Sequence, residues 1–313
     1  MKEERKKSKE VFHQPVLLKE VLEFLEVEGG EKYIDATIGG GGHSLEILKR
    51  GGRVLGIDCD LEAITATGEK IRGLDEWTSR KRGNSLIFQS STYLLILHRG
   101  NFAHLKEIAQ KHGFDQAAGI LFDLGVSAYQ LLTLERGFSF LSDAPLDMRM
   151  DRDLKVTAAD LINGLRKEEL YELFKKLGEE KFALGIARAI VRARSLKPIV
   201  TCSQLARIIV GAVPKRRQKI HPATRCFQAL RIAVNDELNN LKTALPQAVS
   251  LLRPGGRLVV ISFHSLEDRI VKNFLKGRKD LQVLTKKPVR PTNKEIEKNL
   301  KSRSAKMRVG EKK

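Results

Sequence analysis

A run of four glycines between an apolar segment and a helical pattern is the feature that most constrains this fold. "KYIDATI" (32–38) predicts a short buried strand, Gly39 to Gly42 form a turn, and residues 43–50 have helical spacing. Glycine lets a ligand come close to the backbone, and the start of a helix offers free N–H groups. The run therefore favours a ligand-binding turn in an open α/β sheet, although a tight turn alone would also need glycine.

An acidic residue stands at an informative distance beyond this turn. "RVLGIDCD" (53–60) predicts a second strand that reaches Asp58, roughly twenty residues after the glycines, where an acid can accept hydrogen bonds from a ribose. The third glycine of a dinucleotide fingerprint is missing, because Ser44 or Leu45 stands in its place, and no Walker motif follows. The pattern favours S-adenosylmethionine over a nicotinamide cofactor.

Strand and helix patterns alternate along the first part of the chain and return near its end. Such an alternation of short apolar strands and helices predicts a parallel sheet covered by helices on both faces. The segment between about residues 157 and 213 is helical throughout. We therefore expect an open α/β sheet with a helical subdomain inserted in its middle.

Domain boundaries follow from these patterns. We expect a sheet domain over residues 11–132 and 227–313, and an inserted helical substrate-recognition domain over 133–226. The charged residues 1–10 are expected to form a disordered tail. The polar, basic segment 73–91 interrupts the alternation and is expected to be a surface excursion.

The charge of the chain indicates a polyanionic partner. Lys and Arg number 57 against 38 Asp and Glu, which gives a formal net charge of +19, and nucleic acid is the commonest partner of such a protein. Phosphate contacts would suit two groups of cations, although a solvated surface would carry them too: Lys181, Arg188, Arg192 and Arg194, and then Lys215, Arg216, Arg217, Lys219 and Arg225.

The cysteines and the hydropathy pattern indicate the cellular compartment in which the protein works. Cys59, Cys202 and Cys226 are odd in number and form no C-x-x-C pair, which argues against a disulfide framework or a zinc site. No metal is expected. No apolar run approaches the ~18 residues needed to span a bilayer. We expect a cytoplasmic protein without a membrane partner.

Longer sequence blocks resemble one family. "YIDATIGGGGHS", "GILFDLGVS", "DAPLDMRMD", "HPATRCFQALRIAVNDEL", "ISFHSLEDR" and "RSAKMR" stand in the order found in the bacterial RsmH family, also called MraW. These enzymes use S-adenosylmethionine to methylate the N4 amine of a decoding-centre cytosine in 16S ribosomal RNA. The resemblance implies a class I, Rossmann-like methyltransferase sheet. It also implies a set of cofactor-binding residues: Gly41, Gly42, His43, Asp58, Phe102, Asp123 and Gln130.

The sequence departs from the family after the fourth strand. The family usually reads "DLGVSS-P-Q", whereas this chain reads "DLGVSAYQ", with Ala128 in place of a hydroxyl and Tyr129 in place of a proline. This departure puts in doubt an essential hydroxyl at position 128.

The implied reaction requires help for a weak nucleophile, because the lone pair of an exocyclic cytosine amine is delocalised into the ring. The amine has to be positioned in line with the methyl group, and its N–H groups need hydrogen-bond acceptors. Candidate acceptors are the backbone, Ser127 and Asp147.

Other functions remain open at this point. The implied partner is 16S rRNA in the small ribosomal subunit, and a homodimer is among the states that the sequence leaves open. The main alternative is a non-catalytic RNA-binding factor of ribosome assembly that keeps the methyltransferase fold. A small-molecule methyltransferase and a nicotinamide-dependent oxidoreductase are further alternatives.

Overall fold

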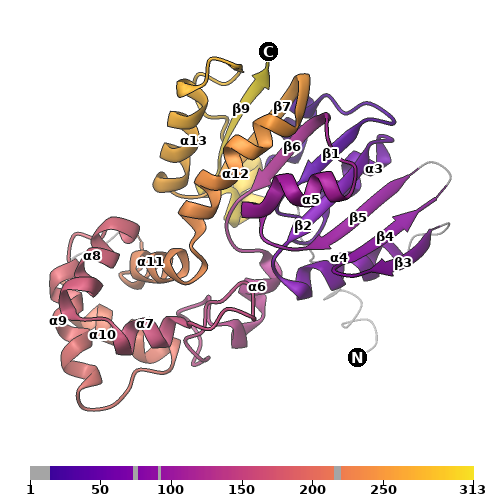
Figure 1. Ribbon diagram of the computed structural model, residues 1–313. Helices are drawn as coiled ribbons and strands as arrows, with labels where there is room; N and C mark the ends of the chain where they lie inside the picture. The colour runs from indigo at the N-terminus through magenta and orange to yellow at the C-terminus, as the bar shows by residue number, and fades with distance from the viewer. Residues whose placement is uncertain (1–14, 73–76, 91–92, 215–219) are drawn as a thin grey trace. The chain divides into compact units, whose positions relative to one another are not determined.

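The chain divides into two compact units. The computed structural model describes residues 15–72, 77–90, 93–214 and 220–313 (Figure 1). One unit takes Met1–Ala128 and Leu238–Lys313, and the other takes Tyr129–Glu237. The expected boundary after residue 226 was wrong, because it lies inside α11 (Ala223–Asn235), whose apolar residues belong to the core of the second unit. The expected tail, residues 1–10, lies outside the described residues.

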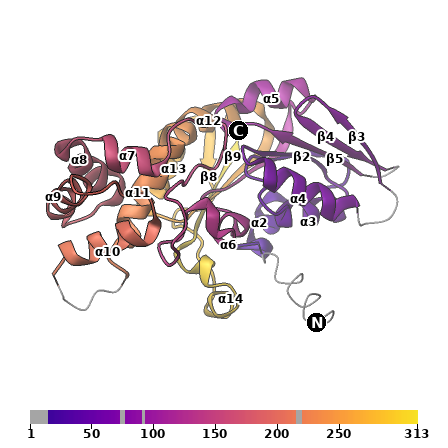
Figure 2. The same ribbon diagram turned by 90° about the horizontal axis from the view of Figure 1, so that it is seen from below.

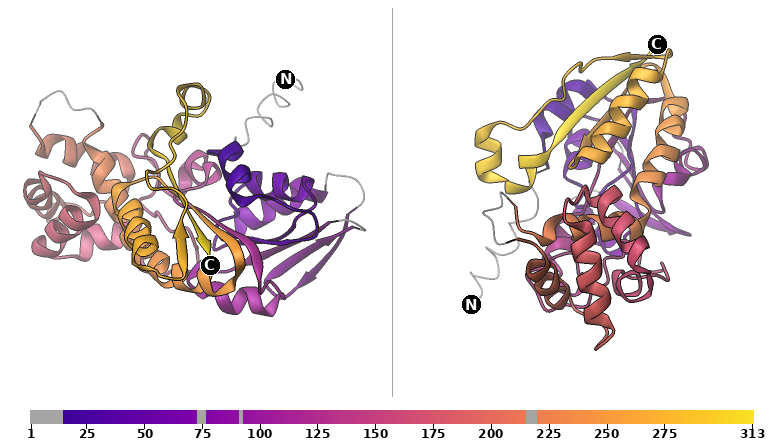
Figure 3. Two further views of the ribbon diagram at one scale, coloured as in Figure 1. Left: turned by 90° about the horizontal axis from the view of Figure 1, so that it is seen from above. Right: turned by 90° about the vertical axis from the view of Figure 1, so that its left-hand side faces the viewer.

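A mixed sheet forms the centre of the first unit. Among the described residues its strands have the order β3-β4-β5-β2-β1-β6-β7-β9-β8. The five strands from β5 to β7 are parallel, and β9 lies antiparallel between β7 and β8 near one edge (Figure 3). The strands are β1 (Lys32–Asp35), β2 (Arg53–Asp58), β3 (Thr78–Arg82), β4 (Ser85–Gln89), β5 (Leu94–Arg99), β6 (Ala117–Asp123), β7 (Leu252–Ser262), β8 (Leu281–Val283) and β9 (Lys306–Lys312).

Helices cover both faces of this sheet, as the alternating pattern predicted (Figure 2). One core joins the sheet to α5 (Leu105–Lys111), α12 (Glu237–Leu251) and α13 (Ser265–Gly277). The other core joins it to α2 (Leu18–Leu25), α3 (Gly42–Lys49) and α4 (Leu61–Arg72). Because both faces are covered, the central strands are continuously apolar rather than alternating, and every residue of β6 before Asp123 is buried.

The insertion at 73–91 is more than the surface excursion that we expected. Residues 73–76 and 91–92 lie outside the described residues, but the remainder forms the β3–β4 hairpin. Strand β3 is exposed throughout, whereas β4 pairs with β5 and places Phe88 fully inside the core. The apolar residues "LIF" in β4 indicate a buried strand, but the polar residues around them made this pattern hard to recognise. Strand β4 extends the sheet and leaves the short cationic β3 as its outer edge.

The second unit is built around helices. They are α7 (Ala158–Gly164), α8 (Lys167–Gly178), α9 (Ala183–Arg194), α10 (Cys202–Ala212) and α11, and their apolar faces share one core. The short α6 (Ala128–Leu132) spans the boundary between the units. Helix α10 begins with a capping box, in which Thr201 Oγ1 accepts a hydrogen bond from the Gln204 amide at 3.3 Å. Among the described residues, no helix has the length and apolar character needed to cross a membrane.

Candidate cofactor edge and substrate loop

Three adjacent parallel strands of the first unit end in aspartate. Asp35, Asp58 and Asp123 are the last residues of β1, β2 and β6, which are neighbours in the sheet. The carboxyl ends of parallel strands are where open α/β sheets bind ligands. We call these three residues, with the glycine turn 39–42, the cofactor edge.

The glycine turn is held from two sides. Thr67 of α4 donates a hydrogen bond from Oγ1 to the Gly39 carbonyl at 3.0 Å, and the Gly39 amide donates to Asp58 Oδ2 at 3.0 Å. Gly41 has a φ of 72°, and a Cβ there would lie 2.7 Å from the Thr67 methyl group. Only glycine meets both conditions, so Gly41 is required by the turn itself.

Asp58 stands where the spacing placed it, at the end of β2. Its two oxygens accept hydrogen bonds from the backbone amides of Gly39 and Asp60, at 3.0 and 2.9 Å. Burial nevertheless raises the pKa of Asp58 to about 6. Each oxygen has a further lone pair, so the same carboxylate that shapes the turn can accept hydrogen bonds from a ligand.

Asp35 and Thr37 are site residues that the sequence reasoning missed. The Asp35 side chain is buried and accepts hydrogen bonds from the Ser44 hydroxyl at 2.8 Å and the Thr37 amide at 3.2 Å. The Thr37 hydroxyl in turn accepts a hydrogen bond from the Asp123 amide at 2.6 Å. The D-x-T motif at the end of a strand is typical of an Asx-turn, and it could have indicated that Asp35 and Thr37 belong to the site.

Asp123 lies opposite a hydrogen-bond acceptor. His43 Nε2 is 3.0 Å from the Val16 carbonyl, so this nitrogen carries the hydrogen. Burial lowers the pKa of His43 to about 4, so the ring is neutral at pH 7. Its Nδ1 therefore carries a lone pair instead of a hydrogen, and it lies 3.8 Å from Asp123 Oδ2. The other oxygen, Asp123 Oδ1, is buried without a hydrogen-bond partner among the described residues. These atoms are complementary to a cation or a hydrogen-bond donor supplied by a ligand.

The charge of Asp123 is unfavourable in the protein alone. Burial raises its pKa to about 8. The negative charges of Asp35 and Glu267 add to this effect, and the ammonium of Lys301 opposes it. A carboxyl group that is costly to ionise and has an unpartnered oxygen is typical of a functional site.

The remaining residues expected at the cofactor fall in three places. Phe102, in the 3-10 turn Phe102–His104, packs edge-on against Phe122 with ring centroids 5.7 Å apart. The Ser127 Cβ lies 3.8 Å from where a Cβ on Gly39 would be, so Ser127 adjoins the glycine turn. Gln130 is buried in α6 and belongs to the second unit.

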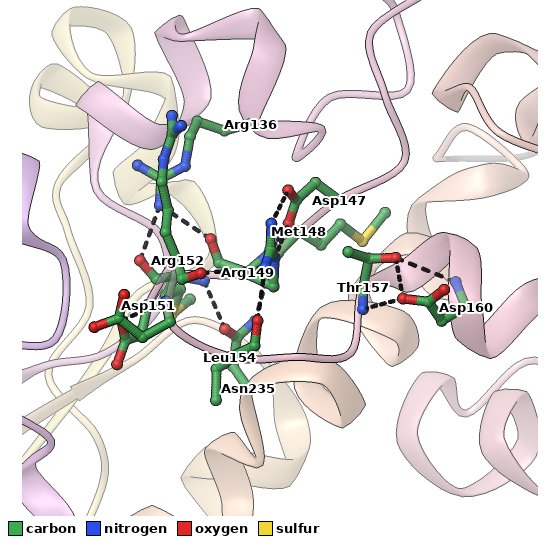
Figure 4. Close-up of polar contacts among 12 residues, drawn as sticks. Arg136, Asp147, Met148, Arg149, Asp151, Arg152, Leu154, Thr157, Asp160 and Asn235 are labelled. Carbon is green, nitrogen blue, oxygen red and sulfur yellow. Dashed lines mark hydrogen bonds and ion pairs between the residues drawn. The ribbon is translucent and has the colours of Figure 1, made fainter.

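Asp147 of the second unit begins a loop, residues 147–154, which we call the substrate loop and whose polar contacts are drawn in Figure 4. Arg149 Nε and Nη2 bind the two Asp147 oxygens, both at 2.8 Å. Arg149 Nη1 donates to the carbonyls of Arg152 and Leu154, at 3.1 and 2.6 Å. Both carboxylate oxygens that we expected to face a substrate amine thus have an arginine partner.

Further contacts fix the same loop within its unit. Met148 is buried in a left-handed conformation with a φ of 64°, which costs energy for a side chain other than glycine. Asn235 holds both sides of it, because its amide accepts from the Met150 N–H at 2.7 Å and donates to the Met148 carbonyl at 2.8 Å. Arg136 adds hydrogen bonds to the carbonyls of Arg149 and Met150.

The expected cationic surface is present in part. Lys181, Arg188 and Arg192 are exposed on or before α9, whereas Arg194 donates to the Ile162 carbonyl. Arg225 binds the Glu179 carbonyl at 3.2 Å. The other cations of the second group, Lys215, Arg216, Arg217 and Lys219, lie outside the described residues.

Comparison with known proteins identifies the family. The model of the MraW methylase family matches residues 10–313. The chain belongs to the MraW methylase family. This confirms the resemblance, and the protein is an S-adenosylmethionine-dependent methyltransferase. One similar protein is named ribosomal RNA small subunit methyltransferase H and comes from Carboxydothermus hydrogenoformans. It is 44% identical over 97% of this chain and 98% of its own length.

Two further comparisons found similar proteins. A protein of the same name from Thermomicrobium roseum is 47% identical over 96% of this chain and 93% of its own. A Streptococcus mutans protein, solved in complex with S-adenosylhomocysteine, covers 96% of this chain and 100% of its own at 13% identity, with a TM-score of 0.45.

Proposed function

We propose that this methyltransferase transfers a methyl group from S-adenosylmethionine to the N4 amine of a decoding-centre cytosine in 16S ribosomal RNA. The names of its relatives support a small-subunit rRNA substrate. The net charge of +19 suits a polyanion. The choice of cytosine N4 rests on the family blocks "DAPLDMRMD" and "ISFHSLEDR" alone.

The observation that carries the cofactor assignment is the unpartnered Asp123 Oδ1 opposite the His43 lone pair. An amino acid's ammonium group would supply the missing donors at this point. Asp58 would accept the ribose hydroxyls, and Gly41, Gly42 and His43 would border the amino-acid end. Phe102 and Gln130 complete the proposed set. When bound, the sulfonium group supplies an activated methyl for transfer.

The chain's own contribution to the reaction is orientation and acceptance of hydrogen bonds. Ser127 adjoins the glycine turn, and its hydroxyl is the acceptor that we propose for the amine. Asp147 remains a second proposed acceptor through its remaining lone pairs, but its pairing with Arg149 also makes it a positioning residue for the substrate loop. The two roles make different predictions, which are tested below.

The decisive experiment is transfer of a labelled methyl group to small-subunit RNA, followed by nucleoside analysis. Two substrates are prepared from cells that lack the enzyme: naked 16S rRNA and assembled small subunits. Asp123→Asn serves as the control with weakened cofactor binding. We expect label in N4-methylcytidine from assembled subunits. Label on a ring carbon or ribose would reject the N4 assignment. Cofactor binding without transfer would favour the non-catalytic assembly factor.

The setting of the reaction forms part of the proposal. A ribosomal substrate would place the enzyme in the cytoplasm, with the assembled small subunit as its partner. Light scattering on the purified protein distinguishes a monomer from a homodimer.

A further inference from the structure

Two buried groups of opposite charge lack partners in the first unit. Asp123 Oδ1 and Lys301 Nζ are both enclosed by protein atoms, and neither makes a hydrogen bond to any described residue. Buried charges in proteins are normally paired, because removing them from water is costly. Two such groups in one unit therefore call for an explanation.

The two charges act on each other through space without forming a direct ion pair. The ammonium of Lys301 opposes the rise in the pKa of Asp123. In return, Asp123 partly offsets burial, which lowers the pKa of Lys301 to about 8. Among the described residues, the imidazole next to Asp123 is the neutral ring of His43, whose Nδ1 lies 3.8 Å from Oδ2. Within the part of the chain that the structure describes, no hydrogen bond or ion pair thus joins two charges that would gain from contact.

Hydrogen bonds hold the backbone at both residues. The Asp123 backbone is held by the Thr37 hydroxyl at 2.6 Å. Lys301 lies in the 3-10 turn Leu300–Ser304, where the next residue, Ser302, is fully buried and donates from its hydroxyl to the Asn299 carbonyl at 2.8 Å. The turn is closed by the Ala305 amide, 2.8 Å from the Ser302 carbonyl.

The segment that carries Lys301 is also tied to the cofactor edge. The preceding helix, α14 (Asn293–Lys298), contributes Glu295, whose Oε1 accepts a hydrogen bond from the Leu17 amide at 2.8 Å. The neighbouring carbonyl, that of Val16, binds His43 at 3.0 Å, and His43 faces Asp123. One chain of contacts thus runs from the C-terminal segment to the carboxylate.

A carboxyl oxygen and an ammonium, both buried without a hydrogen-bond partner among the described residues, are the complement of a zwitterion. S-adenosylmethionine ends in such a group, since its methionine moiety carries an ammonium and a carboxylate on one carbon. We propose that Lys301 binds the carboxylate of this moiety, while Asp123 faces its ammonium. This proposal rests on the cofactor assignment above and adds a residue that neither the glycine turn nor the strand-ending aspartates indicated.

Calorimetric measurement of the affinities for two related ligands tests the role of Lys301 and requires no enzyme turnover. The probes are S-adenosylhomocysteine, which keeps the amino-acid end, and its analogue that lacks only the carboxylate. The full-length protein is expected to bind the analogue about tenfold to a hundredfold more weakly, the effect of one charge-assisted hydrogen bond. This comparison needs no substitution, so it holds even if a variant fails to fold.

Variants then locate the effect on one side chain. Lys301→Met and Lys301→Gln are expected to lose about tenfold to a hundredfold in affinity for S-adenosylhomocysteine and to bind the carboxylate-free analogue as before. Lys301→Arg keeps a positive charge and should retain most of the affinity. Lys298→Met is the matched control, because this lysine is exposed at the end of α14.

The outcomes separate this proposal from the cofactor assignment. Equal wild-type affinity for the two ligands would overturn the role of Lys301 while leaving the cofactor intact. An equal loss for both ligands in Lys301→Gln would overturn it as well, since the lysine would then act on the fold. Failure of the wild-type protein to bind either ligand would reject the cofactor assignment and this proposal together.

Discussion

The pKa values of the aspartates are shifted in opposite directions at the cofactor edge and in the substrate loop. At the cofactor edge, burial raises the pKa of Asp35 and Asp58 to about 6 and that of Asp123 to about 8. In the substrate loop, burial also favours the neutral form of Asp147. Hydrogen bonds and positive charge from Arg149 outweigh it, so the pKa of Asp147 lies below its ordinary value.

This difference separates a region completed by a ligand from one completed by the chain. Asp123 has an oxygen without a partner among the described residues, whereas both oxygens of Asp147 bind an arginine. A substitution at the cofactor edge should therefore change ligand affinity more than stability. A substitution in the substrate loop should change stability more than cofactor affinity. The predictions below test this contrast.

Gly137→Ala should have the largest effect on stability. Gly137 has a φ of 73°, and a Cβ there would lie 2.3 Å from the Pro145 carbonyl oxygen and 2.8 Å from the Asp147 amide. Backbone atoms cannot move aside as side chains can, so we expect a loss of about 3 kcal/mol or more. Calorimetric unfolding measures this loss. Gly164→Ala is the matched control in the same unit, because a Cβ there would meet open space, and it should be nearly neutral.

Asp147→Asn should cost about 1.5–3 kcal/mol in stability, because it weakens the two-point contact with Arg149. Affinity for S-adenosylhomocysteine should be unchanged. If Asp147 also accepts a hydrogen bond from the amine, turnover will fall further than the loss of folded protein explains. Arg149→Lys separates the role of Asp147 in holding the loop from its role as an acceptor. This variant breaks the two-point contact with Asp147 but keeps the carboxylate. Equal turnover losses in the two variants would remove Asp147 as an acceptor.

The sequence predicts the cofactor edge far better than it predicts the substrate loop. The glycine turn, Asp58 and their spacing are local features of a strand–turn–helix–strand unit, so a short window contains them. The contacts of the substrate loop are not local, since Met150 and Asn235 are 85 positions apart. Lys301 is equally hidden, because nothing in a basic segment distinguishes a lysine that folding buries from its exposed neighbours. Strand β4 was missed because its apolar letters stand among polar ones.

Asp123→Asn should reverse the pattern seen for Asp147. We expect a loss of about tenfold in affinity for S-adenosylhomocysteine, because a neutral amide replaces the charge that faces the ammonium. Stability of the ligand-free protein should stay the same or rise, since a buried carboxyl group that is costly to ionise is replaced by a neutral amide. Calorimetry provides both measurements. A marked loss of stability with unchanged affinity would show that Asp123 is a structural residue.

The smallest expected effect is a pH dependence of the ligand-free protein. The folded-state pKa of Asp123, about 8, lies above its ordinary value of 3.8, so the folded protein holds more protons than the unfolded one between these limits. Stability therefore falls as pH rises through this window. His43, with a folded-state pKa of about 4, opposes this trend below its ordinary value of 6.5. Between pH 6.5 and 8 His43 no longer contributes, but Lys301, whose folded-state pKa of about 8 lies below its ordinary value of 10.5, also begins to titrate. The comparison with Asp123→Asn is therefore needed to isolate the carboxyl group.

Within that range the wild-type protein should lose about 1–2 kcal/mol of stability relative to Asp123→Asn. Asp35 and Asp58 contribute little there, since their folded-state pKa values of about 6 lie below it. Thermal unfolding at pH 6.5 and 8 measures the difference, and saturating S-adenosylhomocysteine should abolish it by providing the partner of the carboxylate. Parallel pH profiles for the two ligand-free proteins would mean that Asp123 already ionises freely, and the contrast with the substrate loop would then lose its electrostatic basis.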